Sequence, residues 1–103
     1  MAFDQKTHSI LIKILNIENL DESAQEKIIA ESGSLIYQMV LVKAFELMTE
    51  DQVNEFEKLI ETNPTPETVF EFFREKIPQF DNLIEEEGQR FVDEGKDLMN
   101  QIG

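Results

Sequence analysis

The scarcity of chain-breaking residues is the feature that most constrains the fold of this chain. Only four glycines and three prolines occur in 103 residues. The segments between them space apolar residues three and four positions apart, which is the period of an α-helix. We therefore predict an all-α fold, a compact bundle of four to five helices with a long central helix. The expected helices cover residues 9–16, 21–48, 50–62, 66–77 and 81–101.

The length and the apolar content of the chain indicate one folded domain over residues 1–103. A chain of this length has room for a single hydrophobic core. Its apolar fraction of 41% and charged fraction of 30% are close to those of ordinary globular domains, so it can bury enough surface to offset the entropy lost on ordering.

The first apolar segment fits a helix and a strand almost equally well. Ile10, Ile12 and Ile14 alternate as they would in a strand, and isoleucine favours strands. No second segment is available to pair with such a strand. We therefore predict a short helix here, with Thr7 or Ser9 as its N-cap.

The longest predicted helix starts after Asp21, a residue type that caps helix N-termini well. Gly33 could break this helix, but one apolar stripe stays in phase through it, so we expect a continuous helix in which Gly33 marks a close contact or a kink. From Leu35 to Met48, ten of fourteen positions are aliphatic, Met, Ala or Phe. That is too many for a one-sided surface helix, and it predicts an element buried on all sides.

Local signals also mark the starts of the later helices. Thr49 with Gln52 has the spacing of a capping box. Thr65 is placed to cap a helix whose first residue is Pro66, a position that proline favours. Asp81 is the expected cap of the last helix.

The negative charge is concentrated in the second half of the chain. Residues 1–48 carry 7 acids and 4 bases, a net charge of −3, whereas residues 49–103 carry 15 acids and 5 bases, a net charge of −10. Such a surface repels nucleic acids and anionic membranes and attracts basic proteins. We expect no nucleic-acid partner and no membrane partner, although acidity that only maintains solubility remains an alternative.

The composition argues against several classes of chemistry. The chain has no cysteine and one histidine, His8, so it cannot assemble a thiolate metal site or a two-histidine zinc site. We predict no catalytic residues, no metal and no cofactor. The absence of cysteine and of a clean secretory signal predicts a cytoplasmic location.

Two residue patterns keep a carrier or carboxylate enzyme open as an alternative. Glu57 and Glu61, like Glu71 and Glu75, lie one helical turn apart and would perturb each other if they were buried. Ser34, which precedes a leucine, is the nearest match to the serine of an acyl carrier but lacks the preceding aspartate. We expect the carboxylate pairs to form a solvated face and Ser34 to have a structural role.

The last predicted helix carries the pattern most suggestive of an interface. An apolar seam with alternating spacings of four and three includes two glycines, and a glycine on a helix face implies that something approaches closely. The protein's own core, a partner helix or a second copy of the chain would each satisfy this pattern. The same choice applies to two phenylalanines of the preceding helix. The candidate interface residues are Phe70, Phe73, Ile84, Gly88, Phe91, Gly95, Leu98 and Ile102.

Several segments together resemble a known family. These are Ile14-Leu15-Asn16-Ile17, Leu20-Asp21-Glu22, Leu35-Ile36-Tyr37-Gln38, Leu47-Met48-Thr49-Glu50 and Phe72-Phe73-Arg74-Glu75-Lys76-Ile77-Pro78. In this order they resemble an uncharacterised family of short acidic all-helical proteins, a domain of unknown function found mainly in candidate-phyla bacteria. The resemblance covers residues 10 to about 92. It implies an all-helical fold and a bacterial intracellular setting, and it implies no active residues.

The most concrete functional hypothesis is a small acidic, non-enzymatic protein-interaction module. Its acidic surface would attract a protein partner, and an apolar surface on one of the last two helices would supply contact energy. The partner would be a basic protein, or the chain itself in a homodimer. The alternatives are a structural protein that self-associates through its C-terminal helix, and an inhibitor that mimics nucleic acid and binds a basic protein.

Overall fold

The computed structural model contains five helices and no strand within the part of the chain that it describes. It describes the backbone of residues 3–102 and the side chains of residues 3–97. The all-α prediction is confirmed, including the helical choice for the ambiguous first segment. The five helices are α1 (Gln5–Ile14), α2 (Glu22–Leu47), α3 (Glu50–Ile60), α4 (Pro66–Lys76) and α5 (Phe80–Ile102).

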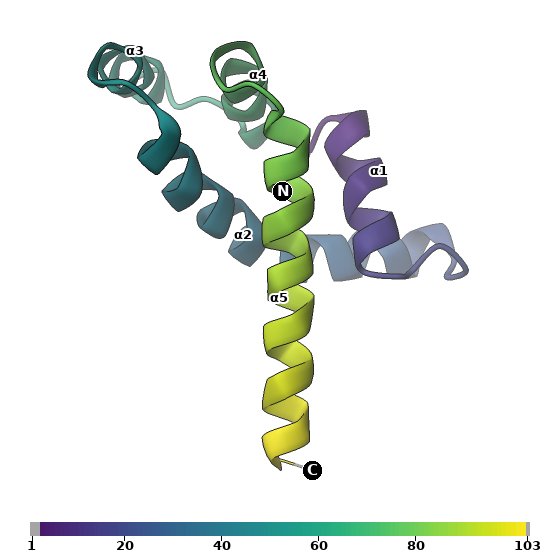
Figure 1. Cartoon of the computed structure of the whole chain (residues 1–103). Coiled ribbons are helices and arrows are strands. Elements are labelled where there is room, and N and C mark those ends of the chain that lie inside the picture. The colour runs from purple at the N-terminus through teal and green to yellow at the C-terminus, as the bar shows by residue number, and fades with distance from the viewer. Residues whose placement is uncertain (1–2, 103) are drawn as a thin grey trace.

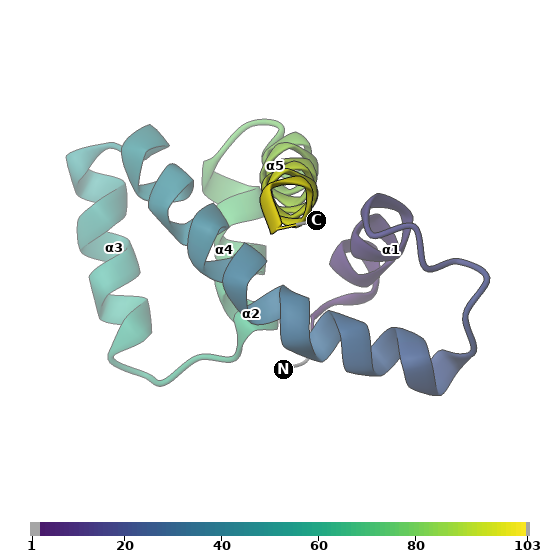
Figure 2. The ribbon, with the colours of Figure 1, turned by 90° about the horizontal axis from the view of Figure 1, so that it is seen from below.

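The helices form a body from which one of them projects. Helix α5 packs against α1 and α2, and α4 packs against both α3 and α5. Figure 1 shows the C-terminal half of α5 running away from the other four helices, with α3 and α4 at the opposite end of the molecule. Seen from below, α2 crosses the body between α1 and α3 (Figure 2).

The predicted start signals of the three middle helices are confirmed. The Asp21 carboxylate accepts a hydrogen bond from the Ala24 backbone N–H at 2.8 Å. The Thr49 capping box is complete, because the Gln52 N–H donates to the Thr49 hydroxyl at 3.2 Å and the Thr49 N–H donates to the Gln52 side chain at 3.0 Å. Thr65 caps α4, of which Pro66 is the first residue. These caps rely on groups three residues apart, so the local sequence specifies them.

The predicted start of the first helix is wrong. Helix α1 begins at Gln5, with Asp4 in the N-cap position. Thr7 and Ser9, the expected caps, lie inside the helix. The Thr7 hydroxyl instead accepts a hydrogen bond at 2.7 Å from Arg74, which is 67 residues away in the sequence. A contact so distant in the chain leaves no local signal.

Two other boundaries also differ from the sequence prediction. Helix α5 begins at Phe80, so Asp81 lies in its first turn and does not cap it. Helix α1 ends at Ile14, followed by Asn16 with a φ of 57°. The Ile17 N–H then donates to Ile12 C=O at 3.2 Å, and the Asn16 N–H donates to Lys13 C=O at 3.1 Å. This pair of bonds is a Schellman motif, which stops a helix at a residue that tolerates the left-handed region.

Helix α2 runs without a break through Gly33, as the phase of its apolar stripe predicts. A Cβ at Gly33 would lie only 2.7 Å from Cε2 of Phe3, so the glycine allows the N-terminal segment to approach the helix. Figure 2 shows a change of direction near the middle of α2. Gly33 and Ser34 occupy that middle, and glycine–serine pairs are a common cause of helix bending.

The prediction that residues 35–48 are buried on all sides is wrong. Ile36, Val40 and Ala44 are buried on one face of the helix. Away from that face, large apolar side chains are left in solvent: the exposed fractions are 51% for Leu35, 60% for Val42 and 42% for Phe45. Leu47, in line with the buried face but at the end of the helix, is 61% exposed.

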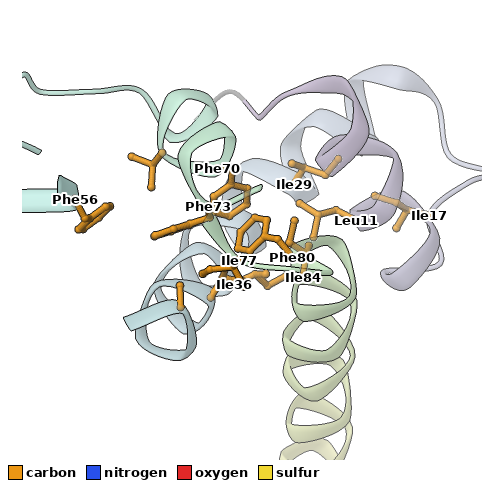
Figure 3. Close-up of a cluster of buried hydrophobic side chains, with 13 residues drawn as sticks. Leu11, Ile17, Ile29, Ile36, Phe56, Phe70, Phe73, Ile77, Phe80 and Ile84 are labelled. Atoms are coloured by element: carbon orange, nitrogen blue, oxygen red, sulfur yellow. The ribbon is translucent and has the colours of Figure 1, made fainter. Parts of the chain in front are cut away.

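The hydrophobic core lies where α4 and the start of α5 meet α1 and α2 (Figure 3). Its centre is aromatic: the ring centroids of Phe73 and Phe80 are 5.4 Å apart, and those of Phe70 and Phe80 are 5.2 Å apart. Phe56 joins α3 to this core by stacking on Phe73 at 5.3 Å. The other core side chains are Leu11, Ile17, Ile29, Ile36, Val40, Ala44, Val69, Ile77 and Ile84.

Candidate functional site

Three of the candidate interface residues lie in the protein's own core. Phe70 is 1% exposed, and Phe73 and Ile84 are fully buried. The core alternative therefore describes these side chains, because the folding of this one chain already covers them. They are not available to a partner on the surface.

The rest of the seam on α5 divides at Phe91. A Cβ at Gly88 would lie 3.1 Å from Cδ1 of Ile14, so this glycine accommodates the contact between α1 and α5. Phe91 is half-buried. Gly95 is exposed, and a Cβ there would meet nothing within 4 Å. The side chains of Leu98 and Ile102 lie outside the described residues. The close approach implied by two glycines thus exists at Gly88 and is unfilled at Gly95.

A shallow apolar groove lies beside the point where α5 leaves the body. We call it the α2–α5 groove. It has a volume of about 380 Å³ and is lined by Leu35, Gln38, Met39, Val42, Phe91 and Glu94. Leu35, Met39 and Val42 stand at positions i, i+4 and i+7 of α2, which places them on one helix face. Most of the lining is therefore apolar, with Gln38 and Glu94 as its polar members.

A larger hollow on the other side of α5 is more charged. This α1–α5 groove has a volume of about 750 Å³, and Ile10 and Ile14 are its apolar members. The rest of its lining consists of polar and charged side chains: Lys6, Ser9, Lys13, Glu85, Glu86, Gln89, Arg90, Asp93, Glu94 and Asp97. With five acids and three bases interspersed, it is typical of a solvated surface with no single chemical preference.

Helix α2 is unusually apolar for a helix with so much exposed surface. Among the described residues it is the one helix whose length and composition would be sufficient to cross a membrane. Only 28% of its most apolar stretch is buried in this structure. Large exposed apolar patches on small proteins commonly mark interaction sites.

An ion-pair cluster around Arg74 joins α1, α4 and α5. The Arg74 guanidinium donates to Asp81 at 2.9 Å, to Thr7 at 2.7 Å and to Asp4 at 2.5 Å. Lys6 binds the other oxygen of the Asp81 carboxylate at 2.5 Å. The cluster fixes the start of α1 and the start of α5 to the last turn of α4.

The charge cluster perturbs the pKa of Asp81. Burial by itself would raise this pKa, but the hydrogen bonds from Lys6 and Arg74 outweigh burial and hold it below its ordinary value of 3.8. A carboxylate whose pKa is lower in the folded state stabilises the fold above its unfolded-state pKa. That stabilisation is lost as the pH falls through the folded-state pKa.

This pKa shift predicts a pH-dependent effect of Asp81→Asn. The variant should be less stable than the wild type by a constant amount between about pH 5 and 7, and the difference should shrink below about pH 4. Urea unfolding of both proteins across this range measures it, and taking the difference removes the effect of the other acids. A difference that is the same at pH 3 and pH 7 would contradict the assignment.

The residues proposed for a carrier or carboxylate enzyme do not converge. Glu57, Glu61, Glu71 and Glu75 are exposed, as expected for a solvated face. A third hollow, of about 410 Å³, lies over the Arg74 cluster. None of the three hollows is lined by Ser34, Glu71 or Glu75. Among the described residues no group of three or more His, Asp or Glu side chains is placed to hold a metal ion.

One buried acid, Glu87, was not predicted from the sequence. Glu87 is 3% exposed and pairs with Arg90, the residue one turn later, at 3.3 Å. It lies three residues after Ile84 and four before Phe91. That spacing puts Glu87 beside the apolar seam on the same helix face, and it was the sequence signal from which the burial of Glu87 could have been predicted. Burial of such a charge with one partner on its own helix marks this side of α5 as closely packed.

The open space at Gly95 leads to a prediction for the projecting half of α5. Gly95→Ala should raise the local helix stability by about 1 kcal/mol, because alanine has the higher helix propensity and its Cβ meets no neighbour. Amide hydrogen exchange of residues 93–97 measures this gain. Gly33→Ala is the matched control and should lack the gain, since its Cβ would displace Phe3. Faster exchange in Gly95→Ala would show that the position is not open.

Comparison with known proteins gives one match. A family model described as a protein of unknown function (DUF5663) matches residues 11–95. The match confirms the resemblance to an uncharacterised family and extends its end from about residue 92 to residue 95, so that it includes Gly95. No curated protein and no solved structure matches the chain.

Proposed function

The chain belongs to this family of proteins of unknown function (DUF5663), and we propose that it is a small, non-enzymatic protein-interaction module. Its contact surface is the α2–α5 groove. This location differs from the sequence-based hypothesis, which placed the apolar contact surface on one of the last two helices. In the fold, most of the exposed apolar side chains of the groove come from α2, and α5 contributes one wall.

The exposure of Leu35 and Val42 carries this proposal. These side chains are 51% and 60% exposed on a helix whose other face is already buried. Exposure of this kind costs about 25 cal/mol for each Å² of apolar surface left in water, so a covering partner would gain that free energy. Phe91, half-buried in the same groove, adds an aromatic side chain of the kind that often anchors interfaces.

Substitution of Val42 should separate binding from folding. Because Val42 is mostly exposed, Val42→Asp should change the free energy of unfolding by no more than about 0.5 kcal/mol. The same change should abolish partner binding, since it places a charge within the apolar strip. Leu20→Asp is the matched control: Leu20 is 44% exposed, lies outside the groove and receives the same added charge.

A photo-crosslinking amino acid at position 42, with one at position 20 as control, tests the proposal in cells of the native host. Position 42 should give a discrete adduct with a second protein, and position 20 should not. Excess unlabelled wild type should compete the adduct away, whereas excess Leu35→Asp protein should not. Equal adducts from both positions, or none from position 42, would contradict the proposed function. An adduct with another copy of the chain would replace it by the self-associating alternative.

A further inference from the structure

The α2–α5 groove presents an apolar strip and a side wall against which one helix could pack. Its floor on α2 is the strip Leu35, Met39 and Val42, whose i, i+4, i+7 spacing matches the apolar face of a second helix laid along it. Its wall on α5 begins at Phe91 and continues into the projecting half of that helix. A helix lying there would contact α2 and α5 at once, as the third member of a three-helix arrangement.

The wall of the groove allows a close helix–helix approach. Nothing lies within 4 Å of a Cβ placed at Gly95, and Asp93 through Asp97 are exposed. Helix axes approach most closely where one helix carries a glycine, because no side chain separates the backbones. Gly95 lies one turn beyond Phe91 on α5.

The charges around the groove select the chemistry of the occupant. Glu31 and Glu46 lie one turn before Leu35 and one turn after Val42, and both are exposed. Glu94 lines the groove on α5. Two of these acids already have a partner within the chain: Glu46 pairs with Lys43 at 3.5 Å, and Glu94 pairs with Arg90 at 3.1 Å. Arg90 also pairs with Glu87 at 3.3 Å. Because the whole chain carries a net charge of −13, an occupant with positive charge beside its apolar face would still be attracted, and it would meet Glu31 at one end of the strip and compete for Glu46 and Glu94.

The same charges disfavour the two other occupants. A second copy would bring another net charge of −13 and the same acidic groove, so two copies would repel each other. An anionic membrane surface would be repelled in the same way. A partner of opposite charge gains steering as well as contact energy.

We propose that the α2–α5 groove binds one amphipathic α-helix with a cationic face, supplied by a partner protein. This inference rests on the proposed function and adds the chemical class of the partner. The apolar face of the bound helix covers Leu35, Met39 and Val42, and its cationic residues face Glu31, Glu46 and Glu94. The projecting half of α5 lies along its other side.

A synthetic probe tests the inference. The probe is a leucine–lysine peptide of about 18 residues with its leucines on one helix face; a scrambled peptide has the same composition, and an acidic analogue has Glu in place of Lys. Isothermal titration calorimetry with the full chain should detect binding of the amphipathic cationic peptide only, and added salt should weaken it. Val42→Asp should weaken binding by about tenfold or more, whereas Leu20→Asp should leave it unchanged.

The charge change of Val42→Asp separates specific from non-specific binding. Simple attraction between an acidic protein and a cationic peptide would grow stronger in both variants, because each adds one negative charge. Occupation of the groove predicts weaker binding in Val42→Asp alone. Equal effects of the two variants, or equal binding of the scrambled or acidic peptide, would overturn the inference.

Two further measurements test the other occupants, and the crosslinking experiment at position 42 tests the proposed function separately. A dimer found by light scattering, lost in Val42→Asp, would assign the groove to a second copy. Groove-dependent binding to vesicles rich in phosphatidylserine would assign it to a membrane. Either result overturns the cationic helix. Crosslinking to a protein at position 42 without peptide binding would overturn the helix chemistry and leave the proposed function standing.

Discussion

Phe73→Ala is expected to lower the free energy of unfolding by about 3–5 kcal/mol, the usual cost of removing a buried phenylalanine from a core. Phe73 is fully buried. Its ring lies 5.3 Å from that of Phe56 on α3 and 5.4 Å from that of Phe80 on α5. The cavity left by alanine would therefore loosen the packing among α3, α4 and α5. Urea or thermal unfolding followed by circular dichroism measures the loss.

Phe45→Ala is the matched control for this substitution. The Phe45 ring also contacts Phe56, at 5.1 Å, but Phe45 is 42% exposed. The same change of side chain should therefore cost only about 1 kcal/mol, since less surface leaves the core and solvent fills the space. Equal losses in the two variants would mean that Phe73 is not at the centre of the core.

Arg74→Met is expected to lower the free energy of unfolding by about 2–3 kcal/mol, less than for a fully buried ion pair because the cluster keeps some contact with water. Methionine retains the apolar stem of the side chain and removes its charge. Asp4, 16% exposed, and Asp81, 26% exposed, then lose their shared partner, and buried Thr7 loses its donor. Chemical unfolding at neutral pH measures the loss.

Two further variants define what Arg74 contributes. Arg74→Lys should recover little of the loss, because one ammonium group cannot reach acceptors on α1 and α5 in the fork geometry of a guanidinium. Lys43→Met removes a pair on the protein surface, where ion pairs contribute little, and should leave stability nearly unchanged. Full recovery by lysine would show that the charge alone matters and that the three-way geometry does not.

The helix starts show which parts of the fold were predictable. Asp21, Thr49 and Thr65 were identified because each cap depends on an acceptor and an N–H group within three residues. The start of α1 was not identified, because Asp4 and Thr7 accept hydrogen bonds from Arg74, which is far away in the chain. The pattern of neighbouring residues contains no information about a contact between residues so far apart in the chain.

The α2–α5 groove likewise combines features that were predictable from the sequence with features that were not. The apolar content of residues 35–48 was read correctly, but its burial on all sides was not, since burial depends on where the other helices lie. The glycine seam of α5 was likewise recognised as a pattern. Ile14 packs against Gly88, whereas the space around Gly95 is open. This difference depends on how far α5 extends beyond α1.

The sequence by itself determined the helical class, the caps of the middle helices, the continuity of α2 through Gly33, the concentration of acids in the second half and the resemblance to an uncharacterised family. These features depend on composition and on contacts within one or two helical turns. Only the tertiary structure decided that Phe70, Phe73 and Ile84 belong to the core, and that Leu35 and Val42 remain exposed beside a projecting helix. Those outcomes depend on which faces the other helices cover, and helix packing is set by the whole chain together.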